Sequence, residues 1–198
     1  MSKIDFSDIN VPELIADMWE PLTEEQREYL SEHFTIQNFK KNEVVHFEGE
    51  TPTHLMCLLT GKVKIYKDGV GGRSQIIRMM KPVEYFGYRA YFSEQAHVTA
   101  AAAFEPSVIC LIPMTVITKL IRQNNDLAMF FIKQLSNDLG MSDTRTVNLT
   151  QKHIRGRLAE SLLFLKESYG IEEDGSTLSI YLSREDLANL SNMTTSNA

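Results

Sequence analysis

The chain changes its hydrophobic period at Pro113, and this change restricts the folds that it can adopt. Residues 39–113 consist of short runs rich in β-branched and aromatic side chains, separated by turn signals such as Thr60-Gly61. Beyond Pro113 the apolar residues recur every three or four positions, which is the period of an amphipathic helix. Many short strands followed by helices predict an α+β protein whose strands form a sandwich or a roll.

Helices are predicted on both sides of the strands. A capping box indicates a short helix ahead of them, because Thr23 can cap it and Gln26 lies three residues later. The long helix after Pro113 has one apolar face, which could pack on the strands or pair with its copy in a second subunit. For an exposed helix of this length we favour self-pairing. The predicted dimer interface consists of Leu127, Phe131, Leu135 and Leu139.

The last quarter of the chain has helical and extended segments in alternation. A helix is expected from Lys152 to Tyr169 with Gly170 at its C-cap, followed by a short strand over residues 177–181. Ser183 is the expected N-cap of a last helix.

That last helix carries the pattern of two helices that meet at a sharp turn. Such helices need a small residue where they touch and a residue that tolerates the left-handed conformation at the turn; Ala188 and Asn192 meet these needs. Thr194 can then cap the second helix. The pattern predicts a helix-turn-helix, with an ordinary helical hairpin as the alternative.

Charge and composition argue against several classes of protein. A formal net charge of −6 counts against nucleic-acid binding over the whole surface, although a few placed cations can still form a local site. The acidic first thirty residues do not resemble a signal peptide, and no stretch could span a bilayer, so we expect a cytoplasmic protein without membrane contact. Cys57 and Cys110 stand apart in apolar runs, as buried core thiols do.

The sequence gives no indication of an enzyme, a metal or a cofactor. There is no His-x-His motif of the kind that holds a catalytic metal on a β scaffold, and no nucleophile lies at a recognisable spacing from a base. The five histidines show no spacing typical of metal ligands, and the two cysteines are too few for an iron–sulfur cluster.

Three segments resemble the CRP/FNR family of regulators (cyclic-AMP receptor protein and fumarate–nitrate regulator), and they occur in the family's order. They are residues 46–50 and 55–66 with Phe86-Gly87, residues 154–159 with the sequence Ile-Arg-Gly-Arg-Leu-Ala, and residues 182–194. Together they cover nearly the whole chain, and their order makes the resemblance specific.

The resemblance implies three parts. Residues 1–125 would form a β-roll sensor of the cyclic-nucleotide-binding, jelly-roll type, residues 126–150 a dimerisation helix, and residues 151–198 a winged helix-turn-helix. In the family the helix-turn-helix continues for several residues and a wing follows it. We therefore expect that the recognition helix is truncated at Ala198, and that this form dimerises well and binds DNA poorly.

The resemblance also implies which residues contact DNA. Arg184 matches a position that contacts phosphate in the family, although an arginine at a helix start can equally be a solvated charge. Family recognition helices commonly open with charged residues, whereas this one opens with hydroxyl and amide side chains, so the preferred operator should differ. The predicted DNA-binding residues are Ser183, Arg184, Thr194, Thr195, Ser196 and Asn197.

The ligand pocket departs from the cyclic-nucleotide pattern. Tyr88 stands where nucleotide-binding relatives have a glutamate for the ribose, and Val98 where they have an arginine for the phosphate, while Thr99-Ala100 keeps the small pair. Loss of that arginine removes about 1.5–3 kcal/mol of charge-assisted hydrogen bonding. We expect a ligand other than cyclic AMP, or none. The predicted pocket comprises Phe86, Gly87, Tyr88, Arg89, Val98, Thr99, Ala100 and Ser142.

The prediction is therefore a homodimeric, DNA-binding transcription regulator controlled by a small effector or signal sensed in the roll. Its expected partners are double-stranded DNA, contacted through residues that continue past Ala198, a second copy of the chain and an unidentified small molecule; RNA polymerase is a further candidate. The alternative is a ligand-binding module that regulates a partner protein without reading DNA. The terminal helix-turn-helix favours the first interpretation, because such a module does not need it.

Overall fold

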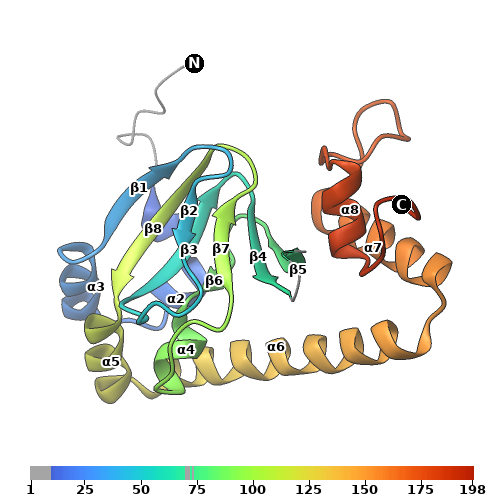
Figure 1. Cartoon of the computed structure of the whole chain (residues 1–198). Helices are drawn as coiled ribbons and strands as arrows, with labels where there is room; N and C mark the ends of the chain where they lie inside the picture. The colour runs from blue at the N-terminus through green and yellow to red at the C-terminus, as the bar shows by residue number, and fades with distance from the viewer. Residues whose placement is uncertain (1–9, 70–71, 73) are drawn as a thin grey trace.

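The computed structural model describes residues 10–69, 72 and 74–198, and residues 1–9 of the predicted sensor lie outside this range. Two four-stranded antiparallel sheets face each other as a β-roll (Figure 1), which confirms the predicted α+β class. One sheet has the strand order β1-β8-β3-β6 and the other β2-β7-β4-β5. The strands are β1 (Thr35–Phe39), β2 (Val44–His46), β3 (His54–Thr60), β4 (Val63–Asp68), β5 (Ser74–Met80), β6 (Tyr85–Phe86), β7 (Ala100–Ala103) and β8 (Ser107–Pro113).

The N-terminal helices and α5 pack on one side of the roll, and the later helices extend beyond it. The predicted capping box is confirmed, because Thr23 Oγ1 accepts from the Gln26 amide at 3.3 Å and Gln26 Oε1 accepts from the Thr23 amide at 3.1 Å. The helices are α1 (Val11–Leu14), α2 (Ala16–Trp19), α3 (Glu24–Ser31), α4 (Tyr88–Phe92), α5 (Met114–Gln123), α6 (Asn125–Gln151), α7 (Ile154–Tyr169) and α8 (Arg184–Leu190).

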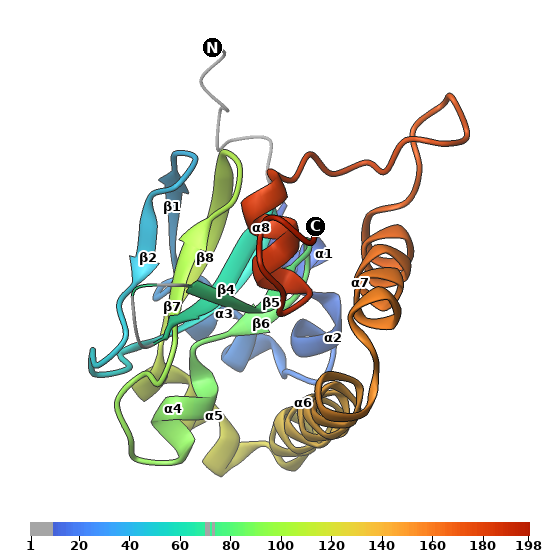
Figure 2. The ribbon, with the colours of Figure 1, turned by 45° about the vertical axis from the view of Figure 1, so that its right-hand side comes forward.

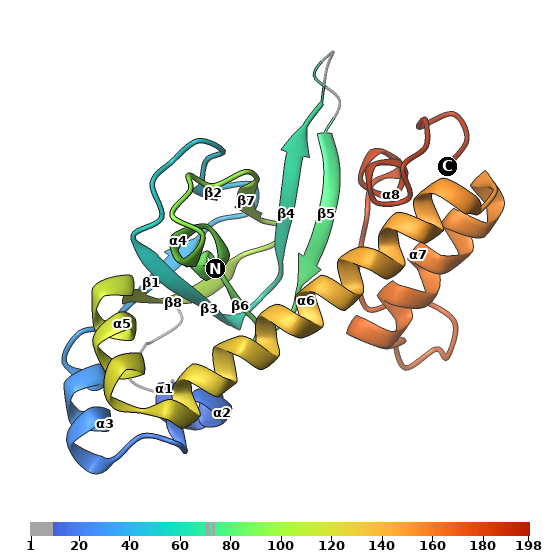
Figure 3. The same ribbon diagram turned by 90° about the horizontal axis from the view of Figure 1, so that it is seen from below.

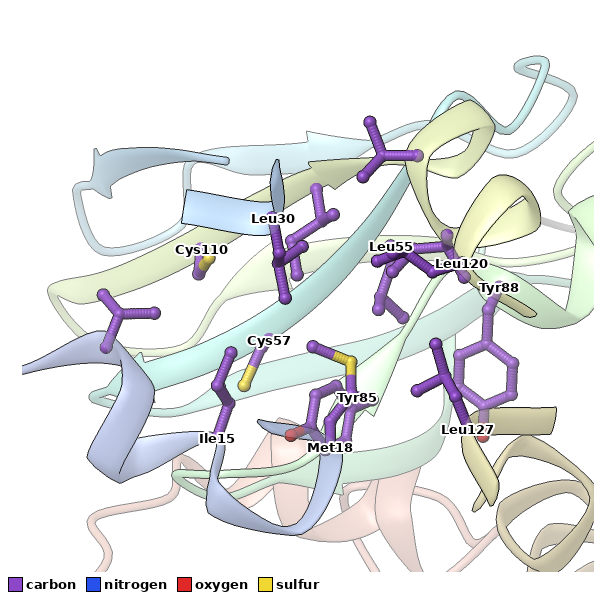
Figure 4. Close-up of a cluster of buried hydrophobic side chains, with 14 of the residues drawn as sticks. Ile15, Met18, Leu30, Leu55, Cys57, Tyr85, Tyr88, Cys110, Leu120 and Leu127 are labelled. Atoms are coloured by element: carbon purple, nitrogen blue, oxygen red, sulfur yellow. The ribbon is translucent and has the colours of Figure 1, made fainter. Parts of the chain in front are cut away.

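Strand β3 is apolar on both faces because both are covered. Alternate side chains of β3 pack into two different clusters, one beneath the helices and one between the sheets. Cys57 lies in the first cluster, directly opposite Cys110 of β8 (Figure 4). Both are buried free thiols, as predicted, and burial raises the pKa of each.

Gly61 allows the turn between β3 and β4 to lie against the neighbouring loop. Its φ is +88°, and a Cβ built there would lie 2.5 Å from the carbonyl oxygen of Pro106 and 2.4 Å from Ser107 Oγ. Ser107 Oγ also accepts from the Lys62 amide at 3.1 Å. A side chain at position 61 would therefore displace a packed backbone.

Helix α6 begins under the roll and runs on beyond it (Figure 3). Its first turns are part of the core, because Leu127 and Phe131 are 0 % and 3 % exposed and pack beside the roll. These two side chains are therefore not available to a second subunit, which corrects their assignment to a dimer interface. Leu135 is partly buried against the same core, whereas Leu139 is 64 % exposed.

The C-terminal unit, defined as residues 154–198, contains α7 and α8. Gly170 ends α7 with φ +80°, as expected for a C-cap glycine. The predicted strand over residues 177–181 is wrong: the segment forms an isolated bridge between Leu178 and Ile171. A local turn replaces the strand, since Asp174 Oδ1 accepts from the amides of Ser176 and Thr177. Within the described residues, no helix has both the length and the hydropathy needed to cross a membrane.

Candidate functional sites

Helix α8 leads into a sharp turn. Ser183 caps α8 by accepting from the Asp186 amide at 3.0 Å. Ala188 is 1 % exposed, and Asn192 adopts the left-handed conformation that was expected at the turn, with φ +51°. No second helix is assigned after this turn in the described residues. The Thr194 carbonyl accepts from the Asn197 and Ala198 amides at 2.9 and 3.2 Å, which forms a single helical turn.

The predicted DNA-contacting side chains are accessible. They lie at the start of α8 and in the turn that follows Met193, and Thr194 Oγ1 lies 3.0 Å from Ser196 Oγ. The exposed set is Ser183, Arg184, Thr194, Thr195, Ser196 and Asn197. None of these six side chains belongs to an apolar core cluster of the described residues.

Arg157 of α7 holds this turn through hydrogen bonds to its backbone carbonyls. Its Nη2 donates to the Asn192 carbonyl at 3.0 Å and its Nε to the Ser191 carbonyl at 3.3 Å. Its Nη1 donates to the Leu149 carbonyl at 3.4 Å, near the end of α6. The conspicuous Arg-Gly-Arg segment thus contributes an arginine that ties α6, α7 and the turn together.

Arg145 joins α6, the roll and α8. Its guanidinium donates to the carbonyls of Ile77 at 2.6 Å and Ile76 at 2.5 Å on β5, and to that of Leu190 at 3.2 Å at the end of α8. Burial lowers the pKa of Arg145, with a smaller effect from Arg78. No carboxylate of the described residues pairs with Arg145. The hydrogen bonds to the three carbonyls therefore offset the cost of burying its charge.

Further contacts hold α8 beside β5 (Figure 2). Lys64 Nζ lies 3.4 Å from Asp186 Oδ1, and the Gln75 side chain donates to the Asn189 carbonyl. Tyr169 of α7 donates to the Met80 carbonyl at 3.2 Å. An apolar cluster completes the contact, and it consists of Ile76, Met79, Phe104, Leu165, Ile180 and Leu190.

The predicted ligand-pocket residues lie in different surroundings. Phe86 and Ala100 are buried in the roll, Gly87 has φ +89° at the start of α4, and Thr99 is half-buried. The other four do not share this interior. Tyr88 packs toward α6, and the side chains of Arg89, Val98 and Ser142 are exposed.

Tyr88 connects the roll to α6. Its hydroxyl donates to Asp138 Oδ2 at 3.1 Å, and Arg78 of β5 pairs with Asp138 Oδ1 at 2.6 Å. Burial, together with the nearby Asp138 carboxylate, raises the pKa of Tyr88, so the phenol stays protonated as the donor. Tyr88 therefore positions α6 against the roll in this structure.

A polar cavity of about 230 Å³ opens between the edge strands β1 and β2. Its deepest residues, Phe39, His46, Met56 and His97, are buried, and its outer residues are mostly polar. The outer residues are Gln37, Glu43, Val44, Val45, Glu50, Thr51, Thr53, His54 and Leu111. Sequence reasoning missed this site, because histidines so far apart give no spacing signal.

His46 and His97 stack inside the cavity wall. Their ring centroids are 3.9 Å apart at 22°, and each residue is 6 % exposed. Burial, assisted by His97, lowers the pKa of His46 to about 4, and burial also lowers the pKa of His97. Both rings are therefore neutral near pH 7. Nδ1 of His46 has no hydrogen-bond partner among the described residues.

The comparisons with known proteins agree with this architecture. Residues 36–124 match the family model described as "Cyclic nucleotide-binding domain". An uncharacterized protein of Haemophilus influenzae is 32% identical over 116 residues, which are 58% of this chain and 87% of that protein. The CRP-like cAMP-activated global transcriptional regulator of Mycobacterium tuberculosis is 23% identical over 77% of this chain and 69% of that protein.

Similarity to a solved structure extends the match to the helices. A CRP/FNR-family transcriptional regulator from Eubacterium rectale superposes with a TM-score of 0.76 at 15% identity, covering 90% of this chain and 81% of that one. The chain belongs to the CRP/FNR family. CRP/FNR membership makes it a transcription regulator with a cyclic-nucleotide-binding-type roll.

Several half-buried charged residues and two buried histidines have contacts here that the family pattern did not indicate. Arg145 and Arg157 hold the C-terminal unit, Asp138 receives Tyr88, and His46 and His97 line the cavity. Arg157 had a signal in the sequence, because it falls in the Arg-Gly-Arg segment. Arg145, Asp138 and the two histidines had none, since each becomes significant only through residues distant in the chain.

Proposed function

We propose that this CRP/FNR regulator binds double-stranded DNA as a homodimer and that its roll senses a small molecule other than cyclic AMP. The observation that carries the DNA-binding proposal is the Ser183-capped helix and the Asn192 turn, after which the side chains of Thr194 to Asn197 are exposed. Exposed hydroxyl and amide groups in that position are suited to base edges and phosphates.

The second copy would pair along α6, through a face different from the one first expected. Met129, Ile132 and Leu139 are 46 %, 52 % and 64 % exposed. Their spacing of three and seven residues places them on one seam of a coiled coil, with Ser136 between Ile132 and Leu139. Leu139 remains in the proposed interface, and Leu135 borders it.

Cyclic AMP is a poor fit for the roll for two reasons. The arginine position of nucleotide-binding relatives is Val98, which is 45 % exposed and offers no charge. Tyr88, in the glutamate position, is committed to Asp138 on α6. The M. tuberculosis relative is activated by cyclic AMP according to its name, so under this proposal the two proteins bind different ligands. Titration calorimetry should detect no micromolar binding of cyclic AMP or cyclic GMP.

Selection of bound fragments from random duplex DNA, using a chain that continues past Ala198, tests the function. We expect enrichment of a two-fold-symmetric sequence whose half-sites lie one helical turn apart, about 34 Å. The variant Arg184→Ala should bind the selected duplex more weakly with a smaller salt dependence, whereas Arg122→Ala, on the exposed side of α5, should not. A flat selection profile would instead favour a module that regulates a partner protein.

A further inference from the structure

The cavity between β1 and β2 has the construction of a binding site. At about 230 Å³ it has room for roughly seven water molecules, or for one small heterocycle. It lies where the roll is open, because β1 and β2 are edge strands of different sheets. The Glu50 carbonyl accepts from the His97 amide at 2.9 Å and the His97 carbonyl accepts from the Gly49 amide at 2.8 Å, so the wall is fixed by backbone bonds.

The charges around the cavity oppose an anion. Glu43 and Glu50 are its charged outer residues, and each carboxylate accepts from a backbone amide, of Lys40 at 2.7 Å and of Phe47 at 2.8 Å. The two histidines beneath them are neutral near pH 7 and offer no positive charge. No lysine or arginine lines the cavity, so a phosphate would meet these carboxylates without a lining cation to balance it.

The ring geometry also opposes a metal. The lone pairs of an imidazole lie in the ring plane, and the rings of His46 and His97 are stacked at 22°, so their nitrogens do not converge on one point. Among the described residues, no three histidine, cysteine or carboxylate side chains come together in a way that could hold a metal ion.

We propose that this cavity is the effector site, and that it binds an uncharged planar heterocycle carrying both a hydrogen-bond donor and an acceptor. Phe39 and Met56 supply apolar contact for the ring faces, and the imidazoles with Thr51 and Gln37 supply polar groups for its edge. His46 has an unsatisfied buried nitrogen, so a small shift of its ring on binding would gain a hydrogen bond. This proposal rests on the proposed function, because it names that function's effector class.

The site lies next to the predicted family pocket. The His46 ring is 6.4 Å from that of Phe86, and His97 precedes Val98 directly. His46 also pairs with Ala101 across β2 and β7. A ligand in this cavity would therefore lie close to β7 and to the Val98-Thr99 segment before it. That segment corresponds to the one that holds the phosphate in nucleotide-binding relatives, and here it carries no charge.

Nuclear magnetic resonance of the full chain with labelled histidines tests the site. The probes are benzimidazole, indene, which has the same shape without hydrogen-bonding groups, and benzimidazole-5-carboxylate, all at pH 8. We expect benzimidazole to shift the His46 and His97 ring signals, and the carboxylate and indene to bind about tenfold more weakly or not at all. If indene binds as tightly as benzimidazole, the proposed hydrogen bonds do not contribute to binding. If benzimidazole-5-carboxylate binds as tightly, the argument that the cavity rejects anions is wrong.

Two matched variants locate the binding. His46→Phe keeps a planar ring and should lose benzimidazole binding, whereas Thr99→Val, in the neighbouring family pocket, should retain it. The folded state of each is checked by the dispersion of its remaining histidine and amide signals. Unchanged binding in His46→Phe, or no shift of the His46 and His97 signals with millimolar benzimidazole, would overturn the proposal. No DNA is present, so failure here is separate from failure of DNA selection.

Discussion

The guanidinium of Arg145 donates a 3.2 Å hydrogen bond to the carbonyl of Leu190, which joins the middle of α6 to the end of α8. The same guanidinium donates to two carbonyls of β5, so the roll, the long helix and the C-terminal unit meet at one side chain. A change in the packing of the roll on α6 would therefore reach α8 through Arg145. The long helix is connected to the roll at a second point through Tyr88 and Asp138.

Replacing Arg145 by methionine should loosen this junction. Met keeps much of the apolar stem but removes three hydrogen bonds to partly buried carbonyls, so we expect a loss of about 2–4 kcal/mol in the free energy of unfolding. Urea denaturation gives the energy, and amide hydrogen exchange should rise in α8 while β3 stays protected. Arg122→Met, at an exposed position of α5, is the control. Equal exchange of α8 in both variants would contradict the assigned role.

The stability of the fold should fall in mild acid because of His46. Its pKa is about 4 in the folded chain and near 6.5 when unfolded, so the unfolded state takes up the proton first. The contribution is fully present above pH 6.5 and is lost as the pH falls through 4, amounting to about 3 kcal/mol at most. Burial also lowers the pKa of the neighbouring His97, so its protonation favours the unfolded state in the same direction.

Urea denaturation between pH 4 and pH 8 measures this dependence. The variant His46→Phe should show a shallower slope between pH 4 and 6.5, since one uptake of a proton on unfolding is gone. His153→Phe changes a histidine in the turn that precedes α7 and serves as the control. A slope that is the same in His46→Phe and in the parent chain would show that His46 does not carry the effect.

Gly61 allows a test that separates crowding from backbone strain. Gly61→Ala combines a φ of +88° with a Cβ only 2.5 Å from the Pro106 carbonyl, while Gly49→Ala has φ +85° and open space. Strain alone costs about 1–2 kcal/mol, so the Gly49 variant should lose that amount and the Gly61 variant about 2 kcal/mol more. Thermal unfolding of the pair measures the difference. Equal losses would mean that the loop at Pro106 yields freely.

The features that were predictable from sequence are those decided by residues close together in the chain. Thr23 and Ser183 cap helices through amides three residues away, and Asn192 adopts the left-handed turn that its side chain tolerates. The strand predicted over residues 177–181 was wrong. Alternation of apolar and polar residues leads to a strand only when a partner strand is present, and here a single bridge to Ile171 forms.

The features that were not predictable depend on what covers a surface. The four-residue period of α6 showed an apolar face, but it could not tell that the roll covers Leu127 and Phe131 while Leu139 stays exposed. An arginine within a helix normally indicates a solvated charge, so the burial of Arg145 needed β5 and α8 in place. His46 and His97 form a site only once two strands and a loop bring their rings together.

The exposed seam of α6 gives the last prediction. If Met129, Ile132 and Leu139 pair with a second copy, Ile132→Glu places a charge in a buried seam and should raise the dimer dissociation constant by at least about tenfold. Asn137→Glu adds the same charge on an exposed position outside that seam and should leave association unchanged. Sedimentation equilibrium measures both. Because neither residue belongs to the core of the roll, a loss of association in Ile132→Glu with an unchanged unfolding midpoint of the roll would locate the interface, whereas equal dissociation constants would exclude this face.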